Sequence, residues 1–228
     1  MNVARSSKHV AIVVGVGPGL GAALVRRFAK EGMDVAMAAR QADRLASLAK
    51  ETGARAYGCD ATVETAVGDL FAAVERDFGR PQLVVFNAGG FVRKPIAELS
   101  VNDMEHAWRS NCLGGFLVGR AAAQAMLSEG SGTIIFTGAT AAMRGGANFA
   151  AFAMGKFGLR ALAQSMAREL GPKGIHVAHT IIDGGIGENA EETKLAPSAI
   201  AEAYWHLHCQ AKSAWTHELD LRPWAEKF

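Results

Sequence analysis

Short runs of apolar, mostly β-branched residues alternate along the chain with longer stretches in which apolar residues recur at helical spacing. The short runs predict strands at 9–14, 34–39, 55–59, 82–87, 132–138, 175–182 and 217–221. The longer stretches predict helices near 19–31, 41–52, 63–78, 101–128, 149–170 and 198–212. Strands joined by helix-length connections are typical of parallel sheets covered on both faces. We therefore expect an α/β fold: a Rossmann-type, doubly wound parallel sheet of about seven strands.

This pattern continues through all 228 residues without a linker, an internal repeat or a low-complexity segment. An α/β domain of this length often forms one unit, so residues 1–228 are expected to be a single nucleotide-binding domain. A formal net charge of +2 and the lack of a block of like charges argue against nucleic acid or an anionic membrane as a main partner.

The cysteines indicate a reducing compartment. Cys59, Cys112 and Cys209 are far apart and form no C-x-x-C pair, which favours free thiols in the cytoplasm. His206 and His208 next to Cys209 are two residues apart on a predicted helix and do not share a face, so we predict no metal site. The N-terminal residues read as a first strand and not as a signal peptide, and no apolar run reaches the length of a membrane span.

The first predicted strand leads into a glycine-rich turn, "VVGVGPGLG". Gly15, Gly19 and Gly21 follow the spacing G-x-x-x-G-x-G, while the stricter G-x-G-x-x-G spacing fails because Leu20 stands where its last glycine would be. Glycines here let the backbone approach a pyrophosphate and direct amide groups of the helix start toward it. The alternative is a turn that only packs the helix against the strand.

The end of the second predicted strand bears on the choice of dinucleotide. Folds that prefer NAD usually place a carboxylate there, but this chain has Ala39 followed by Arg40, which suits the 2′-phosphate of NADP. NADP(H) is thus expected over NAD(H), unless Arg40 is an ordinary solvated side chain. Asp60, after the third strand, either accepts a hydrogen bond from the adenine amino group or caps the next helix.

These motifs, taken in order, resemble those of the short-chain dehydrogenase/reductase family from His9 to about Leu221. The glycine turn resembles T-G-x-x-x-G-x-G, "FNAGG" resembles N-N-A-G, "NCLGG" resembles the helix that carries the catalytic asparagine, and "DGGIG" stands at the family's Pro-Gly turn. The resemblance implies an NAD(P)-binding Rossmann fold. It also implies cofactor contacts from Gly15, Gly19, Leu20, Gly21, Arg40, Asp60, Ala61, Asn87, Ala88, Gly89, Lys156, Gly184 and Ile186.

The family's catalytic positions are only half retained. Its Y-x-x-x-K motif aligns with Phe152 and Lys156, and its serine, 13 residues before the tyrosine, aligns with Ala139. Lys156 and Asn111 remain as candidate catalytic residues. Lys156 either binds the nicotinamide ribose, extends its head to water, or delivers a proton itself because burial lowers its pKa. Asn111 either holds a water molecule or shapes its helix.

The resemblance therefore implies an NADP(H)-dependent oxidoreductase with a non-standard active site and an unidentified small carbonyl or alcohol-like substrate. The alternative is an inactive nucleotide-binding scaffold or NADPH sensor.

A short substrate lid is expected near 184–197. The helices near 111–127 and 149–167 are apolar nearly all round, which favours a homodimer or homotetramer built through them, with burial inside the chain as the alternative.

Overall fold

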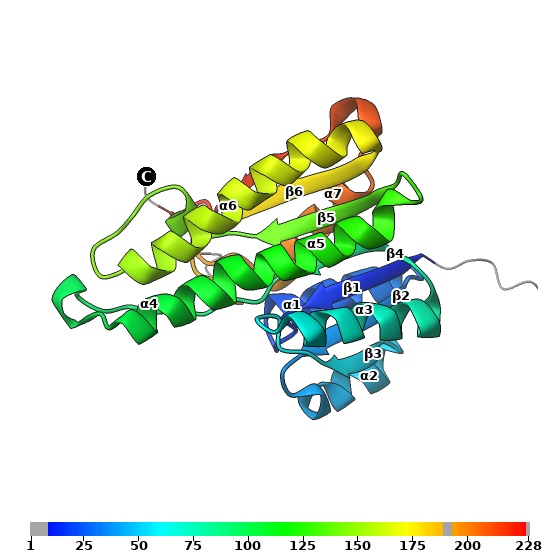
Figure 1. The fold of residues 1–228 in the computed structure, drawn as a ribbon, viewed down its shortest axis with the longest axis horizontal. Helices are drawn as coiled ribbons and strands as arrows, with labels where there is room; N and C mark the ends of the chain where they lie inside the picture. The colour runs from blue at the N-terminus through cyan, green and yellow to red at the C-terminus, as the bar shows by residue number, and fades with distance from the viewer. Residues whose placement is uncertain (1–8, 189–192, 227–228) are drawn as a thin grey trace, which may run out of the picture.

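A computed structural model of the chain describes residues 9–188 and 193–226. Its centre is a seven-stranded sheet in the order β3-β2-β1-β4-β5-β6-β7, in which every neighbouring pair is parallel (Figure 1). The strands are β1 Val10–Val14, β2 Asp34–Ala39, β3 Arg55–Gly58, β4 Pro81–Phe86, β5 Gly132–Thr137, β6 Ile175–Ile182 and β7 Glu218–Leu221. The expected doubly wound parallel sheet is confirmed.

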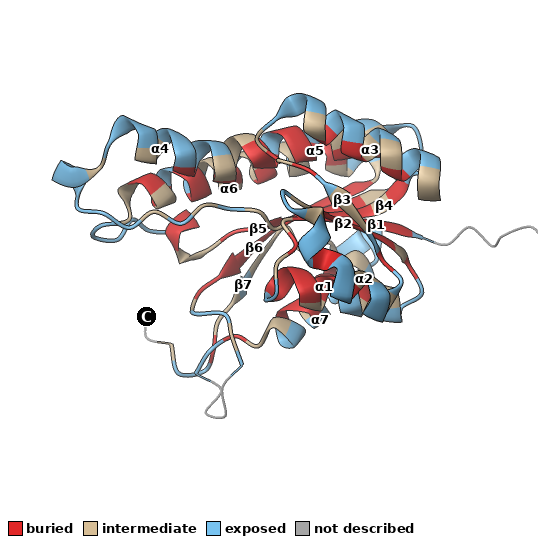
Figure 2. Ribbon diagram, turned by 90° about the horizontal axis from the view of Figure 1, so that it is seen from below, coloured by how far each residue is buried: buried red, intermediate tan, exposed pale blue. Residues whose placement is uncertain are grey.

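Helices cover both faces of this sheet. On one face lie α1 Leu20–Lys30, α2 Ala46–Thr52 and α7 Pro197–His208, and on the other α3 Glu64–Phe78, α5 Gly114–Leu127 and α6 Ala150–Leu170 (Figure 2). The helix α4 Val101–Trp108 leads into α5 through a wide π-helical turn, Arg109–Leu113. Short 3-10 turns occupy Ala42–Leu45, Ile96–Glu98, Thr140–Ala142, Gly171–Lys173 and Lys212–Ala214. No helix among the described residues is both long and apolar enough to span a bilayer.

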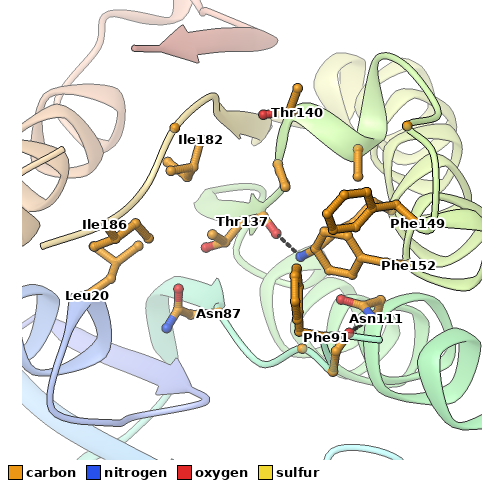
Figure 3. A pocket seen from close by; sticks show the side chains of 18 of the residues that line it. Leu20, Asn87, Phe91, Asn111, Thr137, Thr140, Phe149, Phe152, Ile182 and Ile186 are labelled. Carbon is orange, nitrogen blue, oxygen red and sulfur yellow. Dashed lines mark hydrogen bonds between the residues drawn. The ribbon is translucent and has the colours of Figure 1, made fainter. Parts of the chain in front are cut away.

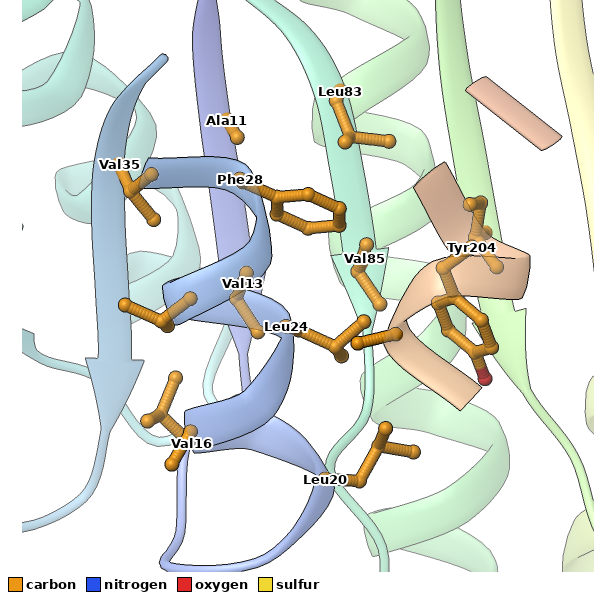
Figure 4. Packing of buried hydrophobic residues seen from close by; sticks show 14 of the residues in the cluster. Ala11, Val13, Val16, Leu20, Leu24, Phe28, Val35, Leu83, Val85 and Tyr204 are labelled. Carbon is orange, nitrogen blue, oxygen red and sulfur yellow. The ribbon is translucent and has the colours of Figure 1, made fainter. Parts of the chain in front are cut away.

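Two hydrophobic clusters, one on each face, hold the layers together. Along β1, Ala11 and Val13 join the cluster under α1 and α7, whereas the alternate residues join the cluster under α3, α5 and α6. Leu24 and Phe28 of α1 lie against β1 and β4 beside α7 (Figure 4). Both faces of β1 are buried, which explains its uninterrupted apolar sequence.

Most predicted boundaries agree with the structure to within a residue. The helix expected near 41–52 begins with the 3-10 turn Ala42–Leu45, and α2 itself starts at Ala46. A second correction concerns the last helix. It was expected to run from 198 to 212 but ends at His208. Gln210 accepts a hydrogen bond from the Thr216 backbone at 2.8 Å, and its carbonyl accepts one from Trp215 Nε1 at 3.3 Å. These contacts turn the chain back toward β7, so the helical spacing beyond His208 is overridden by tertiary contacts.

The strand order sets the position of the site. The chain moves outward from β1 to β3 in one direction and from β4 to β7 in the other, so crossovers diverge between β1 and β4. In open α/β sheets the crevice at the carboxyl ends of such strands is where ligands bind. The glycine turn after β1 and the segment after β4 meet at this edge.

Candidate active site at the carboxyl edge of the sheet

A cavity of about 780 Å³ opens at the carboxyl ends of β4, β5 and β6. Leu20, Asn87 and Ile186 line one side of it, which we call the cofactor end (Figure 3). The rings of Phe91, Phe149 and Phe152 line the opposite side, which we call the aromatic end (Figure 3). Ten of the residues expected at the site line this cavity: Gly19, Leu20, Asn87, Gly89, Asn111, Ala139, Phe152, Lys156, Gly184 and Ile186.

The glycine turn forms a cradle beside the cofactor end. Gly15 has φ +94°, and a Cβ atom there would lie 2.3 Å from the Ala88 backbone nitrogen, so only glycine fits. A Cβ atom on Gly21 would lie 2.7 Å from Val16 Cα. The space around a Cβ atom on Gly19 is open, and no side chain of the described residues caps the start of α1 at this residue.

This cradle fits a dinucleotide. An uncapped helix start presents backbone N–H groups and the positive end of the helix dipole, which is the arrangement that binds a pyrophosphate. Asn87 Nδ2 donates to the Gly15 carbonyl at 3.0 Å and its backbone nitrogen donates to the Val14 carbonyl at 2.8 Å. Asn87 therefore holds the turn to the segment after β4, as well as lining the cavity.

The residues expected at the adenosine lie outside the cavity, near the ends of β2 and β3. Arg40 is exposed after β2. Asp60 Oδ1 accepts from the backbone nitrogen and hydroxyl of Thr62, at 2.9 and 2.8 Å. The backbone hydrogen bond from Thr62 is the main cause that lowers the pKa of Asp60, and Arg40 adds to it through its charge. Asp60 thus shapes the turn before α3, and Ala61 beside it is buried.

Lys156 occupies the floor of the cavity between its two ends. Its Nζ donates to the Thr137 carbonyl at 2.8 Å, and only 6% of the residue is exposed. Burial lowers the pKa of Lys156 to about 8. Nζ also lies 5.8 Å from the centroid of the Phe152 ring, a cation–π distance. The head of Lys156 is therefore held inside the protein, which argues against the alternative that it extends to water.

Asn111 belongs to the π-helical turn, a feature often found at functional sites. Its Nδ2 donates to the carbonyls of Gly90 and Ala107, both at 2.8 Å. Its Oδ1 is buried and has no partner among the described residues. A Cβ atom on Gly89 would lie 2.8 Å from this oxygen and 3.6 Å from Lys156 Nζ, so the two polar atoms border the same small space.

Hydroxyl groups near the lysine are engaged elsewhere. Thr140 Oγ1 donates to Asp183 Oδ1 at 2.5 Å. Tyr204 is fully buried behind the sheet, its hydroxyl lies 2.9 Å from Thr137 Oγ1, and burial raises its pKa to about 12. Tyr57, on β3, donates to Asp77 at 2.9 Å, away from the cavity. None of these tyrosines lines the cavity in the described part of the chain.

An ion pair supports the turn beside the cofactor end. Asp183 stands where the family has proline, is 4% exposed and pairs with Arg222 from the C-terminal segment. Gly184 follows with φ +149°, and a Cβ atom there would lie 2.9 Å from Pro223 Cδ. Within the segment 184–197, where a lid is expected, Ile186 forms a parallel β-bridge with Leu195. Residues 189–192 of this segment lie outside the described residues.

Sequence reasoning missed two groups of residues in this site. One is Phe91 and Phe149, which complete the aromatic end, and the other is the network of Asp183, Arg222 and Thr140. Phe91 directly follows the "FNAGG" segment, so its position was a usable signal. Arg222 stands 39 residues after Asp183, and no spacing rule connects them.

Comparison with known proteins agrees with this geometry. A family model described as short chain dehydrogenase matches residues 9–194. Sorbitol-6-phosphate 2-dehydrogenase of Escherichia coli (strain K12) is 32% identical over 197 residues, which cover 83% of this chain and 76% of that protein. A crystal structure of a short-chain dehydrogenase from Rhodopseudomonas palustris superposes with a TM-score of 0.86 at 43% identity, covering 95% of this chain and 99% of that one.

A metagenomic short-chain oxidoreductase crystallised in complex with NADP is also similar, with a TM-score of 0.85 and 26% identity, covering 96% of this chain and 98% of that one. The family model includes the glycine turn and strands β1 to β6, and the two solved structures cover 95% and 96% of the chain. The chain belongs to the short-chain dehydrogenase/reductase family of oxidoreductases.

Proposed function

We propose that the protein is an NADP(H)-dependent oxidoreductase that acts on a small carbonyl or alcohol-like substrate without the family's tyrosine and serine. The observation that carries the proposal is the joining of a glycine cradle and a buried lysine by one cavity. When bound, the nicotinamide supplies or accepts a hydride. The chain's own residues then have two tasks, to hold the dinucleotide and to manage the proton.

Holding the dinucleotide falls to the turn around Gly15 and Gly19, to Arg40 and to Lys156. The amide groups at the start of α1 face the diphosphate, and the exposed guanidinium of Arg40 pairs with the 2′-phosphate. The ammonium of Lys156 has one hydrogen bond to Thr137 and further N–H groups for the ribose hydroxyls.

Proton management falls to Lys156 and Asn111. A pKa of about 8 lets Nζ both give and take a proton near neutral pH. The unpartnered Oδ1 of Asn111 would accept from a water molecule in the space that it shares with Nζ, and this water would relay a proton from solvent to the lysine after each reduction. Without hydroxyls at Ala139 and Phe152, carbonyl polarisation is weak, so turnover is expected to be slow.

A binding titration tests the cofactor. NADPH should bind at least tenfold more tightly than NADH, and Arg40→Gln should remove that difference because the charged partner of the 2′-phosphate is lost. Arg168→Gln, which removes another exposed arginine, this one from α6, is the matched control and should leave both affinities unchanged. Equal affinity for the two nucleotides in the parent protein would refute the choice of NADP(H).

A turnover assay tests the reaction. NADPH consumption is followed with a panel of aldehydes, ketones and imines, in the parent and in Lys156→Met. A lysine-dependent mechanism is supported if Lys156→Met lowers the turnover rate by a larger factor than it lowers the affinity for NADPH. Tight NADPH binding with no turnover of any compound would instead support the scaffold or sensor.

We also propose that the protein forms a homodimer or homotetramer through α5 and α6. Large apolar side chains stay exposed on these helices: Phe116 is 41% exposed, Met154 53% and Phe157 43%. These exposed side chains support an interface between chains over burial inside a single chain. Light scattering after size exclusion should give a mass that is a multiple of 24.0 kDa, and Phe116→Glu/Phe157→Glu should reduce that mass. The cytoplasmic location stays a prediction.

A further inference from the structure

The charged groups that line the cavity are all of one sign. In the part of the chain that the structure describes, these groups are Arg144 and Lys156, and no aspartate or glutamate lines the cavity. Lys156 is buried, donates to the Thr137 carbonyl and, in the proposed function, holds the ribose. The charges that the described residues bring to the cavity therefore favour an anion over a cation.

Arg144 is the group that a substrate can reach. It lies in the turn after the 3-10 helix Thr140–Ala142, between β5 and the aromatic end, and it is exposed. Its guanidinium forms no hydrogen bond or ion pair with any described residue. A free guanidinium offers a planar pair of N–H donors, which matches the two oxygens of a carboxylate.

The wall beside Arg144 suits a flat ring. Phe91 meets Phe149 and Phe152 edge to face, with centroid distances of 5.7 and 5.3 Å. Phe91 is nevertheless 68% exposed, so much of its apolar surface is available to be covered. Aromatic side chains and aromatic ligands attract one another in offset or edge-to-face arrangements.

The backbone next to Arg144 leaves room for such a ring. Gly145 and Gly146 line the cavity between the arginine and Phe149. A Cβ atom on Gly145 would meet no other atom within 4 Å, so the space above it is open. The 2′-phosphate of a dinucleotide would be met at Arg40, after β2, by a different element of the fold. Arg144 is thus left for the substrate.

We propose that the aromatic end binds an aromatic aldehyde or ketone that carries a carboxylate, with the carboxylate on Arg144 and the ring against Phe91 and Phe149. This inference rests on the proposed function, because it names the substrate class of the same site. It does not depend on the source of the proton.

Benzoate and benzamide are the probes, since they differ in charge but hardly in shape and neither is reduced. Each is titrated into the protein saturated with NADP⁺, and binding is measured by calorimetry. The parent protein should bind benzoate about tenfold more tightly than benzamide. Arg144→Gln should bring the two affinities within twofold of each other and leave NADP⁺ affinity unchanged.

Arg93→Gln is the matched control. Arg93 is a second exposed arginine at this end, but its guanidinium lies outside the cavity over the Phe149 ring, 5.5 Å from the centroid. It should retain the preference for benzoate. A turnover assay makes the same comparison with 4-formylbenzoate and its methyl ester. In the parent protein the two compounds should differ in KM but have nearly equal kcat, because the carboxylate lies away from the reacting carbon.

Equal binding of benzoate and benzamide by the parent protein would overturn the inference and leave the proposed function standing. An equal loss of preference in Arg93→Gln would also overturn it, since a diffuse field and not contact with Arg144 would then be responsible. Absence of NADP⁺ binding would overturn both the inference and the proposed function.

Discussion

Replacing Lys156 by methionine removes a buried ammonium and keeps a side chain of similar length. Burial lowers the pKa of Lys156 to about 8 from an ordinary value of 10.5, so the folded protein binds this proton less tightly than the unfolded chain does. At about 1.36 kcal/mol per pKa unit, burial of the charge costs the native state about 3 kcal/mol at pH 7. The variant also loses the hydrogen bond to the Thr137 carbonyl, at a cost of about 1 kcal/mol. Without nucleotide, Lys156→Met should thus raise the free energy of unfolding by about 2 kcal/mol at pH 7.

This gain should depend on pH in a defined direction. Between pH 8 and 10.5 the unfolded parent chain binds more protons than the folded one, so the parent's free energy of unfolding rises with pH across this window. The variant lacks this contribution, and the advantage of Lys156→Met should shrink to about zero near pH 9.5. Urea unfolding followed by circular dichroism at pH 7 and pH 9.5 measures both differences, with Lys173→Met at an exposed position as the control.

An advantage of the same size at both pH values would refute the argument, because the ammonium would then not be the source of the effect. Loss of stability at pH 7 would refute it as well, since the hydrogen bond to Thr137 would outweigh the burial of charge. Saturating NADPH should reverse the order at pH 7, because only the parent binds the ribose through Nζ.

Three further predictions concern the hydroxyls, the cradle and the ion pair. Phe152→Tyr/Ala139→Ser restores the family's hydroxyl donors in the cavity and should raise the rate of carbonyl reduction, measured as NADPH consumption, by on the order of 10²-fold or more. A double variant that still binds NADPH but shows no gain in rate would contradict this prediction. Gly19→Ala should leave thermal unfolding unchanged but weaken NADPH binding more than tenfold, because its Cβ atom points into open space at the helix start. Gly15→Ala should lower both the unfolding temperature and the affinity for NADPH, because its Cβ atom would lie 2.3 Å from a backbone nitrogen. Equal effects of the two alanine variants would contradict the different roles assigned to these glycines. Arg222→Met leaves a buried carboxylate without its cation and should lower the free energy of unfolding in urea by about 3 kcal/mol, whereas a loss under about 1 kcal/mol would mean that the ion pair is not structural.

Local spacing was sufficient for most of the fold. A strand such as β6 is buried on both faces, so its apolar run was recognisable without knowledge of its neighbours. The start of α4 is fixed by an equally local contact: Ser100 accepts from the Asp103 backbone, and the Asp103 side chain accepts in return, which forms a capping box. Both signals lie within a few residues of each other, where the geometry of one strand or one turn fixes the contacts.

The site was only partly readable by the same means. The glycine turn and the lysine at i+4 from Phe152 are local patterns, and both line or shape the cavity. The environment of Lys156 was open from sequence, with three alternatives, because its partner Thr137 comes from another element 19 residues away. Burial on the floor of the cavity removed one alternative and left the ribose and proton roles as proposals.

The amino-acid sequence by itself determined the α/β layers, the glycine cradle and the absence of hydroxyls at residues 139 and 152, since these follow from periods of two and 3.6 residues and from residue identity. Only the tertiary structure decided which side chains meet, such as Phe91 with Phe152 and Arg222 with Asp183. It also decided that Arg144 lines a cavity with no acidic residue from the described part of the chain. Such contacts join segments separated by dozens of residues. They depend on strand order and on the packing of helices over the sheet, which no local period encodes.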